Sequence, residues 1–73
     1  MIDPKLHSLI KVVETGSFTR AAEQLSLTQP AVSQHIRSLE SELNVRIFER
    51  KNNELHVTHE GETVIKYARR MLS

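Results

Sequence analysis

The chain of 73 residues contains no cysteine and only two glycines and two prolines. Without cysteine, neither a disulfide nor a thiolate metal site can form. No run of apolar residues exceeds two, so the sequence holds neither a membrane-spanning segment nor the core of a signal peptide. It also has no internal repeat and no Gly/Ser/Pro linker. These absences favour a single cytoplasmic domain.

The charged residues are unevenly distributed along the chain. Hydrophobic residues make up 38% and charged residues 26%, which is an ordinary balance for a small globular domain. The formal net charge is only +1, which is weak support for a nucleic-acid partner. However, no acid occurs between Gln24 and Leu39, and Arg46, Arg50 and Lys51 cluster further on. A domain that contacts a polyanion through one helix and one hairpin needs positive charge only there.

The stretch from about 28 to 43 is predicted to form the central helix. Thr28 is a suitable N-cap, because its side-chain oxygen can accept an unpaired backbone N–H of the first turn. Pro30 falls in that first turn, where its missing N–H costs nothing. Apolar residues then recur at spacings of four, three and four and form one stripe that is expected to be buried: Val32, Ile36, Leu39 and Leu43.

The opposite face of this helix is polar. It presents Pro30, Ser33, Gln34, Arg37 and Ser41, with Gln29 on the flank. Amide, hydroxyl and guanidinium groups are the ones that contact base edges and phosphates. We therefore predict that this helix lies in the major groove of DNA.

Two shorter helices are expected before it. Asp3-Pro4 is typical of a helix start, and Gly16 marks the end of that helix. Ser17 can cap a second helix, followed by a turn at Ser26-Leu27 in which Leu27 is expected to be buried. The segment from 17 to about 43 thus has the pattern of a helix-turn-helix.

A hairpin and a last helix are expected after residue 44. Residues 47–48 and 55–57 are predicted to be short strands, joined through Asn52-Asn53, since Asn tolerates the positive φ of a tight turn. Thr58 can cap the last helix. Its apolar positions are more than one small core can cover, so we expect part of this stripe to meet a partner helix in a dimer interface. These positions are Val64, Ile65, Tyr67, Ala68, Met71 and Leu72. Because the helical spacing of apolar residues continues up to the end of the sequence at residue 73, we expect the chain to be the N-terminal part of a longer protein.

Linked motifs along nearly the whole chain resemble the DNA-binding domain of LysR-type transcriptional regulators. They are Ser17-Phe18-Thr19-Arg20-Ala21-Ala22, Leu25, Thr28-Gln29-Pro30-Ala31-Val32-Ser33, Ile36, Leu39-Glu40, Leu43, Ile47-Phe48, Arg50 and Thr58-His59-Glu60-Gly61. The resemblance implies a mainly α fold, a winged helix-turn-helix with three helices, a two-stranded wing and the start of a long linker helix. It implies a DNA-binding domain over 1–58 and the start of the linker helix over 59–73.

The resemblance also implies a bacterial transcription regulator that binds an interrupted inverted repeat of double-stranded DNA as a homodimer. A tetramer and an effector-binding domain with a small-molecule inducer are implied for the full-length protein, with no cofactor in this domain. The expected base contacts are Gln29, Ser33 and Gln34, and Pro30 is expected to pack on a thymine methyl. The expected phosphate contacts are Thr28, Arg37, Arg50 and Lys51.

The sequence departs from the family pattern at several positions. Gln34 stands where Arg is frequent, and glutamine pairs well with adenine whereas arginine prefers guanine. Asn44 replaces the usual glycine. Asn53 stands where the wing often has a basic residue, which shifts the expected wing contact to Arg50 and Lys51.

Other classes of function fit the sequence less well. A winged helix used as a protein-interaction module remains the alternative, but its third helix should then show large apolar or aromatic residues. No nucleophile elbow or glycine-rich phosphate loop is present, so we predict that the chain is not an enzyme. The histidines at 7, 35, 56 and 59 have no zinc-motif spacing and are predicted to be surface residues rather than metal ligands.

Overall fold

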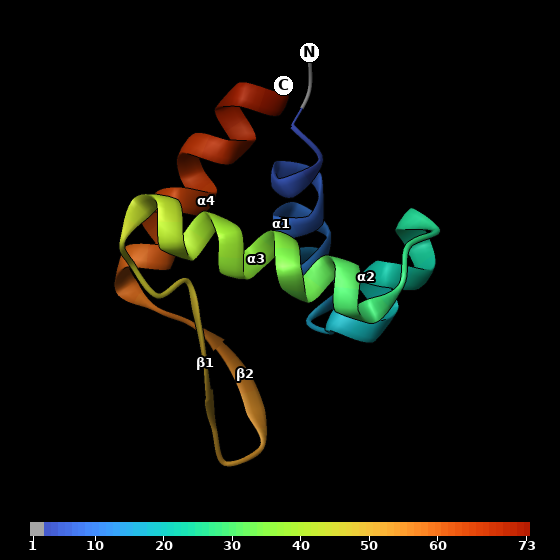
Figure 1. Ribbon diagram of the computed structural model, residues 1–73. Coiled ribbons are helices and arrows are strands. Elements are labelled where there is room, and N and C mark those ends of the chain that lie inside the picture. Colours follow the sequence, from blue (N-terminus) through green and yellow to red (C-terminus); the bar gives the residue numbers. More distant parts are fainter. Residues whose placement is uncertain (1–2) are drawn as a thin grey trace.

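The computed structural model describes residues 3–73 and shows a bundle of helices from which one hairpin projects (Figure 1). The elements are α1 (Pro4–Thr15), α2 (Phe18–Leu25), α3 (Gln29–Leu43), β1 (Phe48–Lys51), β2 (Glu54–Val57) and α4 (His59–Leu72). This order of helices and strands confirms the predicted winged helix-turn-helix.

Each helix begins directly after the residue that the sequence predicts as its N-cap. The Ser17 hydroxyl accepts the N–H of Arg20 at 3.1 Å, and Thr58 accepts that of Gly61 at 2.9 Å. Asp3 and Thr28 cap α1 and α3 in the same way. Gly16 and Asn44 end α1 and α3 with positive φ angles of 70° and 56°. Such caps satisfy the unpaired backbone groups of the helix ends, so local sequence sets the helix bounds.

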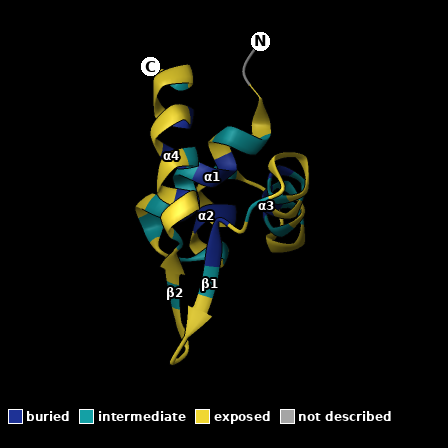
Figure 2. Cartoon of the chain, turned by 90° about the vertical axis from the view of Figure 1, so that its left-hand side faces the viewer, coloured by how far each residue is buried: buried dark blue, intermediate teal, exposed yellow. Residues whose placement is uncertain are grey.

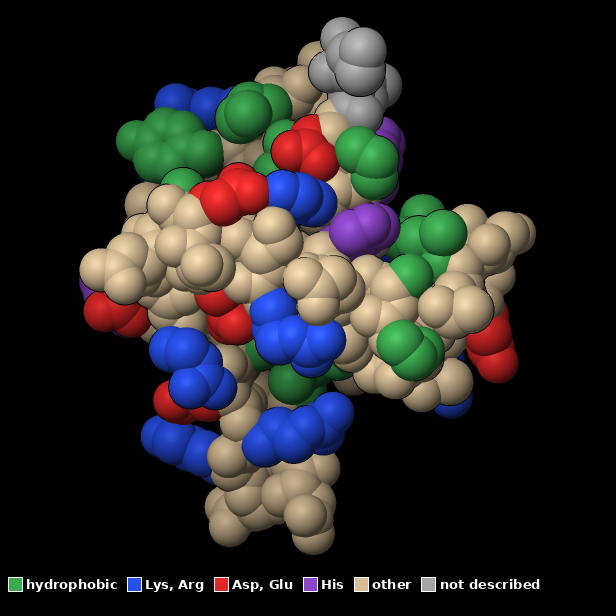
Figure 3. Space-filling view, viewed as in Figure 1, with side chains coloured by type: hydrophobic (Ala, Val, Ile, Leu, Met, Phe, Trp, Pro, Cys, Tyr) green, Lys and Arg blue, Asp and Glu red, His purple; other side chains and the backbone are tan. Residues whose placement is uncertain are grey.

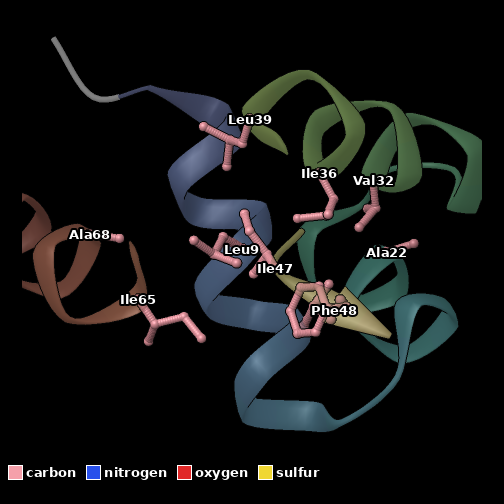
Figure 4. Close-up of a cluster of buried hydrophobic side chains, with 11 residues drawn as sticks. Leu9, Ala22, Val32, Ile36, Leu39, Ile47, Phe48, Ile65 and Ala68 are labelled. Atoms are coloured by element: carbon pink, nitrogen blue, oxygen red, sulfur yellow. The ribbon is translucent and has the colours of Figure 1, made fainter. Parts of the chain in front are cut away.

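The core lies where α1, α2 and α3 pack on one another and where α4 joins α1 (Figure 4). Its buried apolar residues are Leu9, Val12, Ala21, Ala22, Val32, Ile36, Leu39, Ile47, Phe48, Ile65 and Ala68. The paired alanines of α2 are small enough to let the helices approach closely. The core fixes the angle at which α3 is held and leaves its opposite face free.

The hairpin formed by β1 and β2 is antiparallel, with Phe48 paired to Val57 and Lys51 to Glu54. Asn52 and Asn53 have φ angles of 54° and 63°, which confirms the predicted asparagine turn. The hairpin is largely exposed beyond its base (Figure 2).

The first strand begins one residue later than predicted. Ile47 is fully buried in the core rather than paired with β2. Its N–H instead donates to the carboxylate of Glu40 on α3 at 2.8 Å. The expected strand at 47–48 is corrected for this reason.

Two leucines expected to be buried are exposed. Leu27 in the turn before α3 is 40% exposed, and Leu43 in the last turn of α3 is 49% exposed. Leu43 borders a hollow between α3 and α4 together with Tyr67 and Met71. The helical periodicity predicts the face of the helix on which a residue lies. It does not predict how far the core extends along the helix.

Candidate nucleic-acid interface

A groove runs between the outward face of α3 and the base of the hairpin. Its lining residues come from both sides and include Gln29, Ser33, Arg37, Glu40, Arg46, Phe48, Glu49 and Arg50. Lys and Arg side chains gather on this face below α3 and beside the hairpin (Figure 3). The fold therefore brings residues more than ten positions apart in sequence into one surface, which carries three guanidinium groups and two carboxylates together with the apolar side chains of Phe18, Phe48 and Leu55.

The structure places several predicted DNA contacts together here. Gln29, Ser33 and Arg37 follow one another along α3 on the side that faces the hairpin, and Arg50 lies opposite them. The Gln29 amide donates to the Ser33 hydroxyl at 2.6 Å. This bond orients the Gln29 and Ser33 side chains relative to each other.

Other predicted contacts lie outside the groove. Gln34 is exposed on the next row of α3, and its Oε1 accepts a hydrogen bond from Arg37 Nη2 at 3.2 Å. Pro30 is exposed in the first turn of α3. Lys51 is on the hairpin, where its Nζ lies 3.5 Å from Glu49 Oε1. Thr28 precedes α3 and accepts the Ala31 N–H at 3.2 Å.

Sequence reasoning missed the role of Glu40. Its Oε2 accepts the N–H groups of Ile47 at 2.8 Å and Phe48 at 3.4 Å, and it lies 3.9 Å from Arg46 Nε. A single half-buried carboxylate on α3 thus fixes the start of the hairpin. No local pattern signals this, because the contact joins residues seven and eight positions apart across a turn.

Arg46 also lines the groove, whereas the sequence indicates only its positive charge. Its side chain is 76% exposed, so its guanidinium is available at the surface despite the nearby Glu40. Arg46 therefore adds to the positive charge between α3 and the hairpin.

His35 is not the surface residue that the sequence predicts. Its Nδ1 lies 2.6 Å from the hydroxyl of Ser8, a fully buried residue of α1, and the ring is half-buried. The contact gives the Ser8 hydroxyl a partner, and Ser8 is the one buried polar residue among residues 3–73. Within residues 3–73, no group of histidine and acidic side chains is arranged to hold a metal ion.

The apolar face of α4 divides into two parts. Ile65 and Ala68 are only 8% and 2% exposed because they pack into the core of the same chain, which leaves little of either side chain for a partner helix. Tyr67 and Met71 are 54% and 67% exposed. Val64 and Leu72 are half-buried. The exposed part of this face is therefore formed mainly by Tyr67 and Met71.

Residues 4–62 match the family of bacterial regulatory helix-turn-helix proteins described as the lysR family. The chain belongs to this family. The resemblance stated from the sequence is thereby confirmed. No helix within residues 3–73 is both long and apolar enough to cross a membrane.

Curated LysR-family relatives are longer than this chain. A helix-turn-helix transcriptional regulator of Azotobacter vinelandii is 48% identical over 68 residues, which cover 93% of this chain and 47% of the relative. A probable RuBisCO transcriptional regulator of Guillardia theta is 45% identical over 69 residues, covering 94% of this chain and 22% of the relative. The chain thus spans half or less of the length of these relatives.

Solved structures of LysR-type regulators share the fold. A LysR-family regulator from Eggerthella lenta superposes with a TM-score of 0.82 at 40% identity, covering 99% of this chain and 97% of that one. The DNA complex of the CbnR DNA-binding domain gives a TM-score of 0.86 at 32% identity, covering 93% and 78%. The BenM domain bound to benA site 1 DNA gives 0.85 at 38% identity, covering 93% and 76%.

Proposed function

We propose that this LysR-family chain is the DNA-binding domain of a transcription regulator and that α3 enters the major groove. The observation that supports this most strongly is the groove between α3 and the hairpin. It combines base-reading amide and hydroxyl groups with the guanidinium groups of Arg37, Arg46 and Arg50. The similar CbnR and BenM domains are crystallised with DNA, which supports the same partner here.

The proposed roles follow from the position of each side chain. Gln29 and Ser33 lie along α3 toward the hairpin and contact bases, and Gln34 does so from the next row. Pro30 lies at the tip of α3, where its ring can pack on a thymine methyl. Arg37, Arg50 and Lys51 neutralise phosphates. Thr28 keeps its oxygen for the helix cap, and its hydroxyl proton is free to donate to a phosphate.

The oligomer and the full-length protein are part of the proposal. A homodimer formed through α4 places two α3 helices in successive major grooves of an interrupted inverted repeat. Following the family resemblance, we propose that the full-length bacterial protein is cytoplasmic, can form tetramers and has an effector domain that binds a small-molecule inducer. The domain itself acts by binding rather than by catalysis and needs no cofactor.

Fluorescence anisotropy with a labelled duplex tests this function. The chain is expected to bind a family-type inverted repeat more tightly than a scrambled duplex, and binding should weaken steeply as salt is raised. Gln29→Ala should cost about 1–3 kcal/mol on the inverted repeat and little on the scrambled duplex. Lys51→Ala, the comparison variant, should weaken both duplexes equally and lower the salt slope by roughly 1.

The outcomes separate the candidate functions. Equal losses on both duplexes for Gln29→Ala would contradict base reading by this residue. An absence of binding even at low salt would overturn the proposal and favour the protein-interaction module instead.

A further inference from the structure

The connection between α3 and β1 is held in place by two helices. The carboxylate of Glu40 on α3 accepts the N–H of Ile47 at 2.8 Å. Thr58, the N-cap of α4, donates its hydroxyl to the carbonyl of Arg46 and its N–H to the carbonyl of Ile47, the latter at 2.9 Å. The backbone at Arg46 is therefore fixed by α3 on one side and by the start of α4 on the other.

The side chain of Arg46 is free although its backbone is held. It is 76% exposed and lines the groove between α3 and the hairpin. Within residues 3–73 its only ion pair is with Glu40, at 3.9 Å between Nε and Oε2, which is too long for a hydrogen bond. That oxygen already accepts the N–H groups of Ile47 and Phe48. The guanidinium thus keeps its N–H donors, and a long pair with one exposed member costs little to break.

The groove carries its three guanidinium groups on three different supports. Arg37 is on α3, Arg50 is on β1, and Arg46 is on the connection between these elements. Phosphates recur along each strand of a DNA duplex at every nucleotide. Because the three groups come from separate supports, we expect them to contact separate phosphates.

The fixed backbone favours binding by Arg46. A side chain that contacts a phosphate loses rotamer freedom, and a flexible connection would lose backbone freedom as well. At Arg46 the hydrogen bonds of Glu40 and Thr58 have already restricted the backbone. Only the side chain remains to be ordered on DNA.

We propose that Arg46 is a further DNA-binding residue, which leaves Glu40 and contacts one backbone phosphate at the junction of α3 and the hairpin. The inference rests on the proposed function, in which α3 lies in the major groove. It adds one contact to those proposed for Arg37, Arg50 and Lys51. Because a phosphate contact carries no base information, Arg46 should set affinity and salt dependence and leave the sequence preference unchanged.

Fluorescence anisotropy with the inverted-repeat and scrambled duplexes tests the affinity. Arg46→Met should weaken binding to both duplexes roughly tenfold at low salt and lower the salt slope by roughly 1. Arg46→Lys keeps the charge and should keep the slope. Arg69→Met is the matched control, because it removes an exposed guanidinium of α4 outside the groove and should change neither quantity.

Inverted-repeat duplexes with single methylphosphonates, which lack the phosphate charge, locate the contact. At one position in each half-site, the substitution should weaken binding of the unmodified chain but should not weaken Arg46→Met any further. Arg50→Met should show the same insensitivity at a different position, because Arg50 is on the hairpin.

A Glu40→Gln background separates direct contact from an effect through Glu40. Glutamine keeps an oxygen for the N–H groups of Ile47 and Phe48 but lacks the charge. Most of the loss caused by Arg46→Met should remain in this background. A loss abolished there, or a scan in which no phosphate is coupled to Arg46, would overturn the inference alone. If the unmodified chain binds neither duplex at low salt, the proposed function fails and the inference falls with it.

Discussion

At the scale of single residues, Gly61 determines how closely α4 approaches the start of the hairpin. The first turn of α4 lies against the backbone of Ile47, whose carbonyl also accepts the Thr58 N–H at 2.9 Å. A Cβ at position 61 would meet the Ile47 carbonyl carbon and Cα at 3.0 Å and its oxygen closer still. These are backbone atoms, so they cannot move aside as the end of a flexible side chain can.

Gly61→Ala is therefore expected to destabilise the fold by about 1–3 kcal/mol, although alanine is the better helix former. Urea unfolding followed by circular dichroism measures the change. Thr63→Ala is the control, because Thr63 is exposed on the same helix and should lose little or no stability. A Gly61→Ala variant as stable as the unmodified chain would show that α4 can shift without cost.

Single residues also mark the limit of sequence prediction. The caps Ser17, Thr28 and Thr58 were predictable because a cap acts on a backbone N–H within three residues of itself. The contacts of Glu40 with the hairpin, and of Ser8 with His35, were not predictable. They depend on how whole elements pack, which a periodic pattern does not encode.

At the scale of elements, an ion pair joins the start of α1 to the end of α3. Lys5 donates a hydrogen bond to Glu42, and Ser38 also donates to this carboxylate, at 3.2 Å. The bond from Lys5 lowers the pKa of Glu42 below its ordinary value of 4.5. The same bond raises the pKa of Lys5 above 10.5. Lys5 is half-buried and Glu42 is exposed, so solvent screens the pair and its contribution is small and salt-sensitive.

The stability that the pair contributes depends on pH in a defined window. Because the pKa of Glu42 is lowered on folding, its carboxylate stabilises the folded state above pH 4.5. This contribution is lost as the pH falls through the pKa of Glu42 in the folded state. Because the pKa of Lys5 is raised on folding, its ammonium group stabilises the folded state below pH 10.5. This contribution is lost as the pH rises through the pKa of Lys5 in the folded state. Lys5→Met should therefore lower the free energy of unfolding most between these limits.

Urea unfolding at several pH values checks this expectation. The difference between the unmodified chain and Lys5→Met should shrink below pH 4.5 and above pH 10.5. In a Glu42→Gln background, Lys5→Met should have almost no further effect near neutral pH. An equal loss in both backgrounds would show that Lys5 acts through packing rather than through Glu42.

The elements themselves follow closely from the sequence. The helical spacing of Val32, Ile36 and Leu39 gave the buried face of α3, and Asn52-Asn53 gave the hairpin turn. The same spacing failed at Leu43, which is 49% exposed at the border of the hollow between α3 and α4. The helical spacing also predicts the polar face of α3, because that face lies opposite the apolar stripe. The groove between α3 and the hairpin cannot be predicted in this way, because it depends on tertiary packing.

At the scale of the whole molecule, the groove proposed to contact DNA and a hollow beside α4 are lined by different residues. Basic side chains gather at the junction of α3 and the hairpin, whereas near the end of α4 apolar side chains lie beside basic side chains (Figure 3). A hollow there is bordered by Leu6, Leu43, Val64, Tyr67 and Met71. An uncovered apolar surface remote from the proposed DNA contact is what a dimer of such domains needs, since both α3 helices must stay free.

A Tyr67→Glu/Met71→Glu variant should therefore lose dimerisation while keeping its fold, because both side chains are exposed in the single chain. Analytical ultracentrifugation should show a monomer where the unmodified chain self-associates. On DNA, affinity for a duplex with both half-sites should fall to that for a single half-site, which should itself be unchanged. Lys66→Glu, a control that places a glutamate on the other side of α4, should dimerise normally. An equal effect of both variants would mean that added negative charge, rather than loss of the apolar surface, weakens association.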